Sequence, residues 1–193
     1  MHSRQACARS EVSSCDGADV KELVLGGVRC GKSRYAEQQA RASGLRVVYI
    51  ATAIAAGDAE LEERVRRHRE YRPADWATVE EPVALGATLR AHAHAQCCLL
   101  VECLTLWVAH LLTAGSAERL ELECASLLRA LAVVPGRVIL VSNETGLGVM
   151  PVGELSRRFL DVSGELHQSL AALCDRVTLV VAGLPQRLKE TPQ

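Results

Sequence analysis

A three-layer α/β/α fold around a mostly parallel sheet is predicted by two features of the sequence. First, short, continuously apolar runs alternate with longer helical patterns along the chain. Runs that are apolar without alternation are typical of parallel strands covered on both faces. Second, a glycine-rich turn joins the first apolar run directly to the first helical pattern. Because crossovers between parallel strands are right-handed, the helices are expected in two layers, one on each side of the sheet.

The first half of the chain is expected to begin with a strand at 22–25, which the glycine-rich turn connects to a helix at 32–42. A second apolar run follows at 46–51. The segment 58–70 opens with an aspartate N-cap and carries glutamates early and arginines late, as the helix dipole favours. The amphipathic segment 83–93 predicts a further helix.

The second half of the chain repeats the pattern. Its first strand opens the longest apolar run of the sequence, 97–115, and a Pro-Gly pair at 135–136 ends the helix that precedes the fourth strand. The expected strands are 97–103, 138–142 and 177–182, and the expected helices are 105–112, 118–133 and 155–174.

Length and composition predict one catalytic domain. The chain has 193 residues; 21–193 are expected to form a single nucleotide-binding domain, and the small, polar residues 1–20 a flexible N-terminal extension. Lys and Arg number 22 against 23 acidic residues, a balance that argues against a nucleic-acid partner. The apolar run 97–115 holds Glu102 and His110, which argue against a membrane span. Eight cysteines without C-x-x-C spacing and no secretory leader predict a cytoplasmic protein.

The turn at 26–33 reads GGVRCGKS and matches the phosphate-binding pattern G-x-x-x-x-G-K-[ST]. Backbone N–H groups of such a loop close around phosphate oxygens, and the helix N-terminus adds positive potential. Lys32 is then expected to reach the β- and γ-phosphates, and Ser33 to ligate Mg²⁺. The expected residues for binding GTP or ATP are Gly26, Gly27, Val28, Arg29, Cys30, Gly31, Lys32 and Ser33.

A carboxylate on the magnesium side is expected at the end of a neighbouring hydrophobic strand, and Glu102 closes the run Leu99–Glu102. An acidic residue in that position is often only a solvated strand end. The phosphate-binding loop favours the metal role, so Ser33 and Glu102 are the expected magnesium ligands.

The segment 58–70 places one histidine on an apolar helix face. Leu61, Val65 and His68 fall at i, i+4 and i+7. Two interpretations stay open from this pattern. His68 packs against the protein while the arginines beside it are solvated, or its neutral imidazole is a nucleophile toward phosphorus and the arginines neutralise phosphates.

Over residues 22–189 the sequence resembles the adenosylcobinamide kinase/adenosylcobinamide-phosphate guanylyltransferases of bacterial cobalamin synthesis. Five segments carry the resemblance, and two more extend it. They are GGVRCGKS at 26–33, YIATA at 49–53, RVRRHREYRPADWATVEEP at 64–82, LLVECLTLWVAHLL at 99–112, VSNETGLGVMP at 141–151, RRFLDVSGELHQSLA at 157–171 and LVVAGLPQRLK at 179–189.

The resemblance implies a RecA-like P-loop NTPase fold and a bifunctional transferase. Such an enzyme phosphorylates the aminopropanol hydroxyl of adenosylcobinamide with GTP or ATP, then transfers GMP from GTP to give adenosylcobinamide-GDP. The family's guanylylated histidine falls on His68, and Lys32 is the second expected catalytic residue. The resemblance further implies that the protein is a homo-oligomer, a trimer. The resemblance also implies that the nucleotide site is lined by Ala51, Thr52, Ala53, Arg69, Glu70, Tyr71, Arg72, Glu80 and Glu102.

Three positions depart from the family pattern: Cys30 replaces a serine, Thr145 a valine and His167 an asparagine. Cys30 stands near a helix N-terminus that favours thiolate, so oxidants or alkylators should inactivate the protein unless nucleotide is bound. The loop 143–148, NETGLG, follows the fourth strand at the edge where open α/β sheets bind ligands. It is either a corrinoid-binding loop or an ordinary glycine turn.

Two other functions stay open on the sequence alone. A P-loop kinase of another small hydroxyl substrate would need Lys32, Ser33 and Glu102 but no covalent histidine. A nucleotide-binding regulatory module would change conformation without group transfer. The sequence leaves undecided whether both activities are retained, whether ATP or GTP serves the kinase, and which group is the kinase base.

Overall fold

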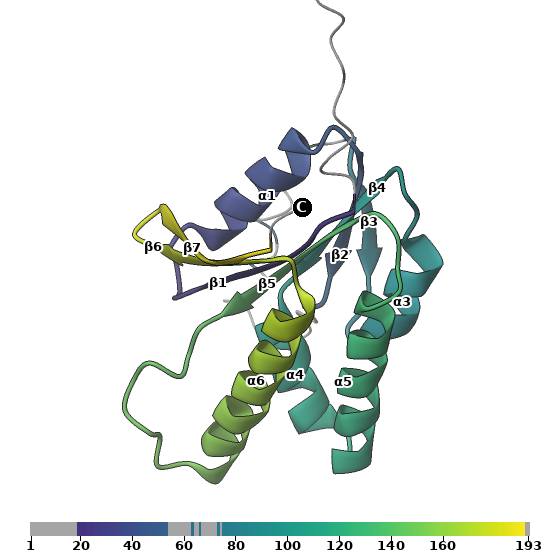
Figure 1. Cartoon of the computed structure of the whole chain (residues 1–193). Helices are drawn as coiled ribbons and strands as arrows, with labels where there is room; N and C mark the ends of the chain where they lie inside the picture. Colours follow the sequence, from purple (N-terminus) through teal and green to yellow (C-terminus); the bar gives the residue numbers. More distant parts are fainter. Residues whose placement is uncertain (1–18, 54–62, 64–65, 67–72, 74, 192–193) are drawn as a thin grey trace, which may run out of the picture.

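The computed structural model (Figure 1) describes residues 19–53, 63, 66, 73 and 75–191. These residues contain a seven-stranded sheet in the order β3–β2–β4–β5–β1–β6–β7. The strands from β3 to β6 in this order pair in parallel, and β7 pairs antiparallel to β6. The bounds are β1 Lys21–Gly26, β2 Arg46–Ala51, β3 Ala77–Glu80, β4 Cys97–Glu102, β5 Arg137–Asn143, β6 Arg176–Val181 and β7 Leu184–Glu190.

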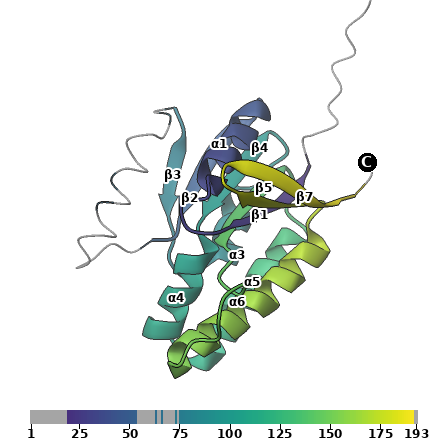
Figure 2. The same cartoon turned by 90° about the vertical axis from the view of Figure 1, so that its left-hand side faces the viewer.

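The described helices lie on both faces of this sheet, as the two views show (Figures 1 and 2). Helix α1 covers one face, and α3, α4, α5 and α6 cover the other. The bounds are α1 Lys32–Ala42, α3 Leu85–His92, α4 Leu104–Ala114, α5 Ala117–Leu131 and α6 Glu154–Leu173. The three-layer arrangement with a mostly parallel sheet confirms the predicted fold class.

The two faces of the sheet hold separate apolar cores, because successive residues of a strand point to opposite sides. Leu99 and Val101 of β4 face the four-helix layer around Trp107, whereas Cys98 and Leu100 face α1. All five side chains are fully buried. Strands buried on both faces explain why their sequences are apolar without alternation.

Every strand predicted from the sequence is present, with ends that match or differ by one residue, but two edge strands were not predicted. Strand β3 is short and mostly exposed, so its sequence ATVE lacks an apolar run. Strand β7, LPQRLKE, is exposed at six of seven positions and carries charge and a proline. Edge strands bury little surface, and hydrophobic patterns cannot reveal them.

A buried carboxylate holds β7 to the sheet. Glu22 of β1 is fully buried, and Arg187 of β7 donates to its Oε1 at 3.0 Å. Thr178 donates to the same oxygen at 2.8 Å, Tyr35 at 3.1 Å, and Arg137 reaches Oε2 at 3.4 Å. A buried charge needs such partners because desolvation is costly. The network therefore joins the charged edge strand to the first strand of the sheet.

The first described residues already belong to the packed structure. Val20 is buried, and its carbonyl accepts a hydrogen bond from the Val138 amide at 3.0 Å. Residues 1–18 of the expected extension lie outside the described part of the chain. Within the described residues, no helix has both the length and the apolar character needed to cross a bilayer.

Candidate nucleotide-binding and transfer site

The phosphate-binding loop starts where β1 ends. Gly26 is the last residue of β1 and pairs with Asn143 of β5 and Val180 of β6. A Cβ on Gly26 would stand 2.6 Å from the Val180 carbonyl oxygen and 2.5 Å from the Cys30 sulfur. Gly31 has φ 97°, a conformation that side chains rarely adopt. Both glycines are therefore required by the backbone path of the loop.

Lys32 and Ser33 open α1 directly behind the loop. Lys32 is 8% exposed, and its Nζ donates to the Gly27 carbonyl at 3.1 Å, so the amine lies across the mouth of the loop. The Ser33 hydroxyl donates to Oε1 of Glu102. Residues 69 positions apart in sequence thus meet at one sheet edge. The sequence places these two groups on different elements, and the structure brings them into contact.

A tyrosine that sequence reasoning missed holds the second oxygen of this carboxylate. Tyr49 of β2 is 3% exposed and donates to Oε2 of Glu102 at 3.1 Å. In the β2–β4 register, Tyr49 lies opposite Leu100, and both side chains belong to the core between the sheet and α1. Only the pairing of β2 with β4 could reveal this contact, because both residues look like ordinary strand positions in the sequence. Tyr49 and Ser33 therefore bind different oxygens of the Glu102 carboxylate, Oε2 and Oε1.

The ends of β3, β2 and β4 bring three further predicted residues together. Ala51 pairs with Glu80 on one side and with Glu102 on the other. Thr52 follows Ala51 and is fully buried; its amide donates to the Glu102 carbonyl at 3.1 Å and its hydroxyl to the Cys103 carbonyl at 2.7 Å. These bonds fix the chain as it leaves β2 beside the phosphate-binding loop.

The predicted nucleophile and its neighbours lie outside the described residues. These are His68, Arg69, Glu70, Tyr71 and Arg72. Two described residues of the predicted helix 58–70, Glu63 and Arg66, are helical. Arg66 forms two hydrogen bonds to the Glu63 carboxylate, at 2.7 and 2.8 Å, across one turn of that helix.

A chain of polar side chains supports the end of β5 next to the loop. Nε2 of His167 lies 2.8 Å from the Ser142 hydroxyl, which lies 3.3 Å from the Thr105 hydroxyl. Thr105 accepts from the Asn143 amide at 2.7 Å, and the Glu144 amide donates to the Gly26 carbonyl at 3.0 Å. Burial lowers the pKa of His167, partly opposed by the charge of Glu144. The histidine that departs from the family pattern therefore contacts Ser142 at the end of β5, and its burial favours the neutral imidazole.

Two cysteines near the loop, Cys30 and Cys103, are both partly buried. Cys30 is half-buried, and its carbonyl accepts from the Gly183 amide at 2.7 Å, which ties the loop to the β6–β7 turn. Burial raises the pKa of the Cys103 thiol, so this second thiol stays protonated. Nucleotide protection of Cys30 against thiol reagents stays a prediction.

The oxygen ligands present fit a magnesium ion. Mg²⁺ is usually held by one or two side-chain oxygens together with substrate phosphates. Ser33 and Glu102 supply such oxygens beside the loop, and no cluster of three or more His, Cys, Asp or Glu that could bind a metal occurs among the described residues. Bound there, Mg²⁺ would offset negative charge on the transferred phosphate.

The fold and this loop define the class of protein: a P-loop NTPase with a RecA-like three-layer fold. Solved structures with the same fold include the flagellar accessory protein FlaH from Methanocaldococcus jannaschii, with a TM-score of 0.50, 12% identity, and coverage of 91% of this chain and 80% of that chain. A Pyrococcus horikoshii OT3 protein aligns with a TM-score of 0.52 and 10% identity, over 92% of this chain and 89% of that chain.

The family follows from sequence comparison. The model of the family described as cobinamide kinase / cobinamide phosphate guanyltransferase matches residues 22–188. The bifunctional adenosylcobalamin biosynthesis protein CobP of Pseudomonas aeruginosa is 58% identical over 90% of this chain and 99% of its own length. The CobU protein of Escherichia coli K12 is 36% identical over 86% of this chain and 98% of its own length. The chain belongs to this family of bifunctional transferases, which confirms the resemblance drawn from the sequence.

Proposed function

We propose that the protein phosphorylates the aminopropanol hydroxyl of adenosylcobinamide with GTP or ATP and then transfers GMP from GTP to the product, giving adenosylcobinamide-GDP. The observation that carries this proposal is the contact of Ser33 with Glu102 beside the phosphate-binding loop, within a chain of the cobinamide kinase family. The expected partners are therefore adenosylcobinamide and its phosphate.

In the first step, the acceptor hydroxyl loses its proton and its oxygen forms a bond to the γ-phosphorus, while the bond to the β–γ bridging oxygen breaks. Lys32 is already at the loop mouth, so its amine can exchange the Gly27 carbonyl for phosphate oxygens. Backbone N–H groups of the loop offset the charge on the departing diphosphate. Positioning and charge stabilisation supply most of the catalysis in such transfers.

In the second step, an imidazole nitrogen of His68 forms a bond to the α-phosphorus of GTP, and the bond to pyrophosphate breaks. An oxygen of the corrinoid phosphate then attacks the histidine-bound phosphorus and releases His68. Dividing the transfer between two displacements replaces one difficult step by two easier ones. The arginines beside His68, Arg69 and Arg72, are proposed to neutralise the phosphates of this second transfer.

The experiment is to incubate the protein with adenosylcobinamide, Mg²⁺ and either GTP or ATP, and to identify the corrinoid products by mass spectrometry. Wild type should give the phosphate with a suitable donor and the GDP product with GTP. His68→Ala should stop at the phosphate, whereas Lys32→Ala should lower its formation by about 100-fold or more. Formation of the GDP product by His68→Ala would contradict the histidine step.

The two alternatives make different predictions in the same assay. A kinase of another small hydroxyl substrate would leave adenosylcobinamide unchanged but would transfer phosphate to a smaller alcohol. A regulatory module would bind GTP and convert neither.

A cytoplasmic location is supported by Cys30, Cys97, Cys98, Cys103, Cys124 and Cys174, which are all free thiols. The homo-oligomer, a trimer by the family resemblance, stays a prediction that sedimentation would test.

A further inference from the structure

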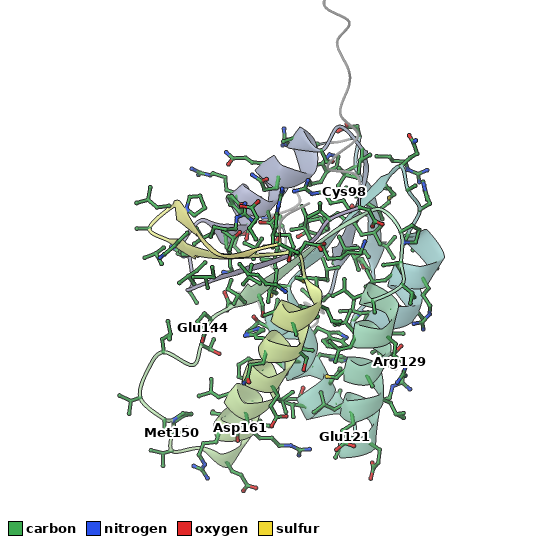
Figure 3. The ribbon with its side chains drawn as sticks, in the orientation of Figure 1. Cys98, Glu121, Arg129, Glu144, Met150 and Asp161 are labelled. Atoms are coloured by element: carbon green, nitrogen blue, oxygen red, sulfur yellow. The ribbon has the colours of Figure 1, made fainter. Side chains whose placement is uncertain are left out.

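An apolar groove lies below the phosphate-binding edge, between two helices and the loop that follows β5. It has a volume of about 430 Å³. Helices α4 and α6 form two walls, and the loop forms the third (Figure 3, where the loop runs from Glu144 past Met150). The lining residues are Ala109, Leu112, Thr113, Thr145, Val149, Pro151, Leu155, Ser156, Phe159 and Leu160.

The loop exposes apolar side chains that its own packing does not use. Val149 and Val152 are each 95% exposed, and Leu147 is 85% exposed. Apolar side chains collected on one loop beside an apolar groove are typical of a surface that binds a ligand or partner. The volume falls within the usual range for small-molecule sites, about 300–1,000 Å³.

Two of the three walls, the loop and α4, lead back to the nucleotide site. The loop leaves the sheet at Glu144, whose amide is bonded to the Gly26 carbonyl of the phosphate-binding loop. Helix α4 begins at Leu104, two residues after Glu102. At 1.5 Å per residue, Ala109 and Thr113 lie about 8 and 14 Å along α4 from its first residue. An occupant of the groove is therefore close to the site of transfer but does not overlap the phosphates.

This separation indicates a large acceptor with its reactive group on an arm. A small alcohol that fills the phosphate site cannot also reach side chains about 14 Å along α4. A macrocycle seated in the groove can do both, if its hydroxyl-bearing arm extends toward the loop. The arrangement thus favours a corrinoid over the small hydroxyl substrate of a generic P-loop kinase.

The chemistry of the lining also fits a corrinoid. None of the ten lining side chains is charged, and Thr113, Thr145 and Ser156 add hydroxyl groups among aliphatic and aromatic surfaces. A corrin ring is edged with methyl groups and uncharged carboxamides. Methyl groups gain by burial against the apolar walls, and carboxamides can pair with the hydroxyls without the desolvation of a charged partner.

We propose that this groove is the docking site for the corrin ring of the acceptor, with Val149 on the loop wall and Leu155 on the α6 wall as its principal apolar contacts. This inference rests on the proposed function, because it assigns the acceptor of that same reaction. The loop 143–148 then connects the ring site to the phosphate site, and its residues continue into the groove at Thr145.

The test compares two valines of the same loop that are equally exposed. Val149 lines the groove, whereas Val152 does not. Val149→Asp should weaken the binding of cobinamide by about 10-fold or more, because it places a charge in the apolar contact. Val152→Asp, the matched control, should bind like wild type. Leu155→Gln should weaken binding from the opposite wall, and all three variants should bind GTP with unchanged affinity.

Cobinamide binding is measured by equilibrium dialysis with the full chain, and sedimentation velocity is recorded for each variant. Equal cobinamide affinity for wild type, Val149→Asp and Leu155→Gln would overturn the groove assignment and leave the proposed function intact. If Val149→Asp changed the oligomeric state without changing cobinamide affinity, the groove would be a contact between copies, and the inference would fail. Absence of cobinamide binding by a wild type that binds GTP would overturn the proposed function itself.

Discussion

Removing one hydroxyl group, in Tyr49→Phe, should impair catalysis without impairing the fold of the phosphate-binding loop. The hydroxyl donates to Glu102 at 3.1 Å, and Tyr49 is 3% exposed, so water cannot readily take its place. A hydrogen bond to a charged group contributes about 1.5–3 kcal/mol. If half of this energy serves to orient the carboxylate toward Ser33, kcat/KM for phosphoryl transfer should fall by about 4- to 13-fold.

The assay follows phosphoryl transfer to cobinamide at increasing Mg²⁺ concentration. Because Tyr49 positions an expected metal ligand, the Mg²⁺ concentration for half-maximal rate should rise, while GTP binding measured without Mg²⁺ stays unchanged. Tyr35→Phe is the matched control: it removes a tyrosine hydroxyl that donates to another carboxylate, Glu22, also at 3.1 Å. An unchanged Mg²⁺ dependence in Tyr49→Phe, or an equal change in Tyr35→Phe, would refute the reasoning.

Three further predictions concern stability. Burial lowers the pKa of His167. Below about pH 6.5 the unfolded chain therefore binds a proton at this residue more readily than the folded chain, and the free energy of unfolding falls. His167→Asn should lose this pH dependence, which is measured by urea titrations at pH 7.5 and 5.5. Glu81 accepts from the Val83 and Ala84 amides at 2.8 and 2.7 Å in the turn before α3. Glu81→Ala should therefore cost about 1 kcal/mol in urea unfolding, and no loss would refute the role of these two bonds. Arg187→Met removes the partner that lies 3.0 Å from the buried Glu22. The free energy of unfolding should fall by about 2 kcal/mol, less than for a fully buried pair because the arginine is partly exposed. Thermal melting that matches wild type would contradict this.

The central sheet could be predicted because its strands are buried on both faces. The run Cys97–Glu102 is apolar at every position before its terminal acid, and the structure buries those positions fully or nearly so. Sequence order also predicted the loop between β1 and α1, since its glycines meet a backbone requirement that other residues cannot satisfy. The two edge strands could not be predicted, because exposed strands carry no apolar pattern.

The site was predictable only where chemistry is local in sequence. Lys32 and Ser33 belong to one motif, so their roles could be assigned without knowledge of the sheet. Tyr49 could not, because its meaning depends on the register that places β2 beside β4. The apolar groove has the same origin: residues of α4, α6 and the loop 144–153 come together only after folding. Long-range register and packing are tertiary properties that a local pattern does not contain.

The central claim, a bifunctional transferase that carries GMP on a histidine, is tested most directly with GTP labelled at the α-phosphorus. Purified wild type and His68→Ala are incubated with the labelled GTP and Mg²⁺ without corrinoid, and covalent label is measured after denaturation. Our account predicts acid-labile label on wild type and none on His68→Ala. Absence of label on a wild type that demonstrably binds GTP, or equal label on both proteins, would contradict it.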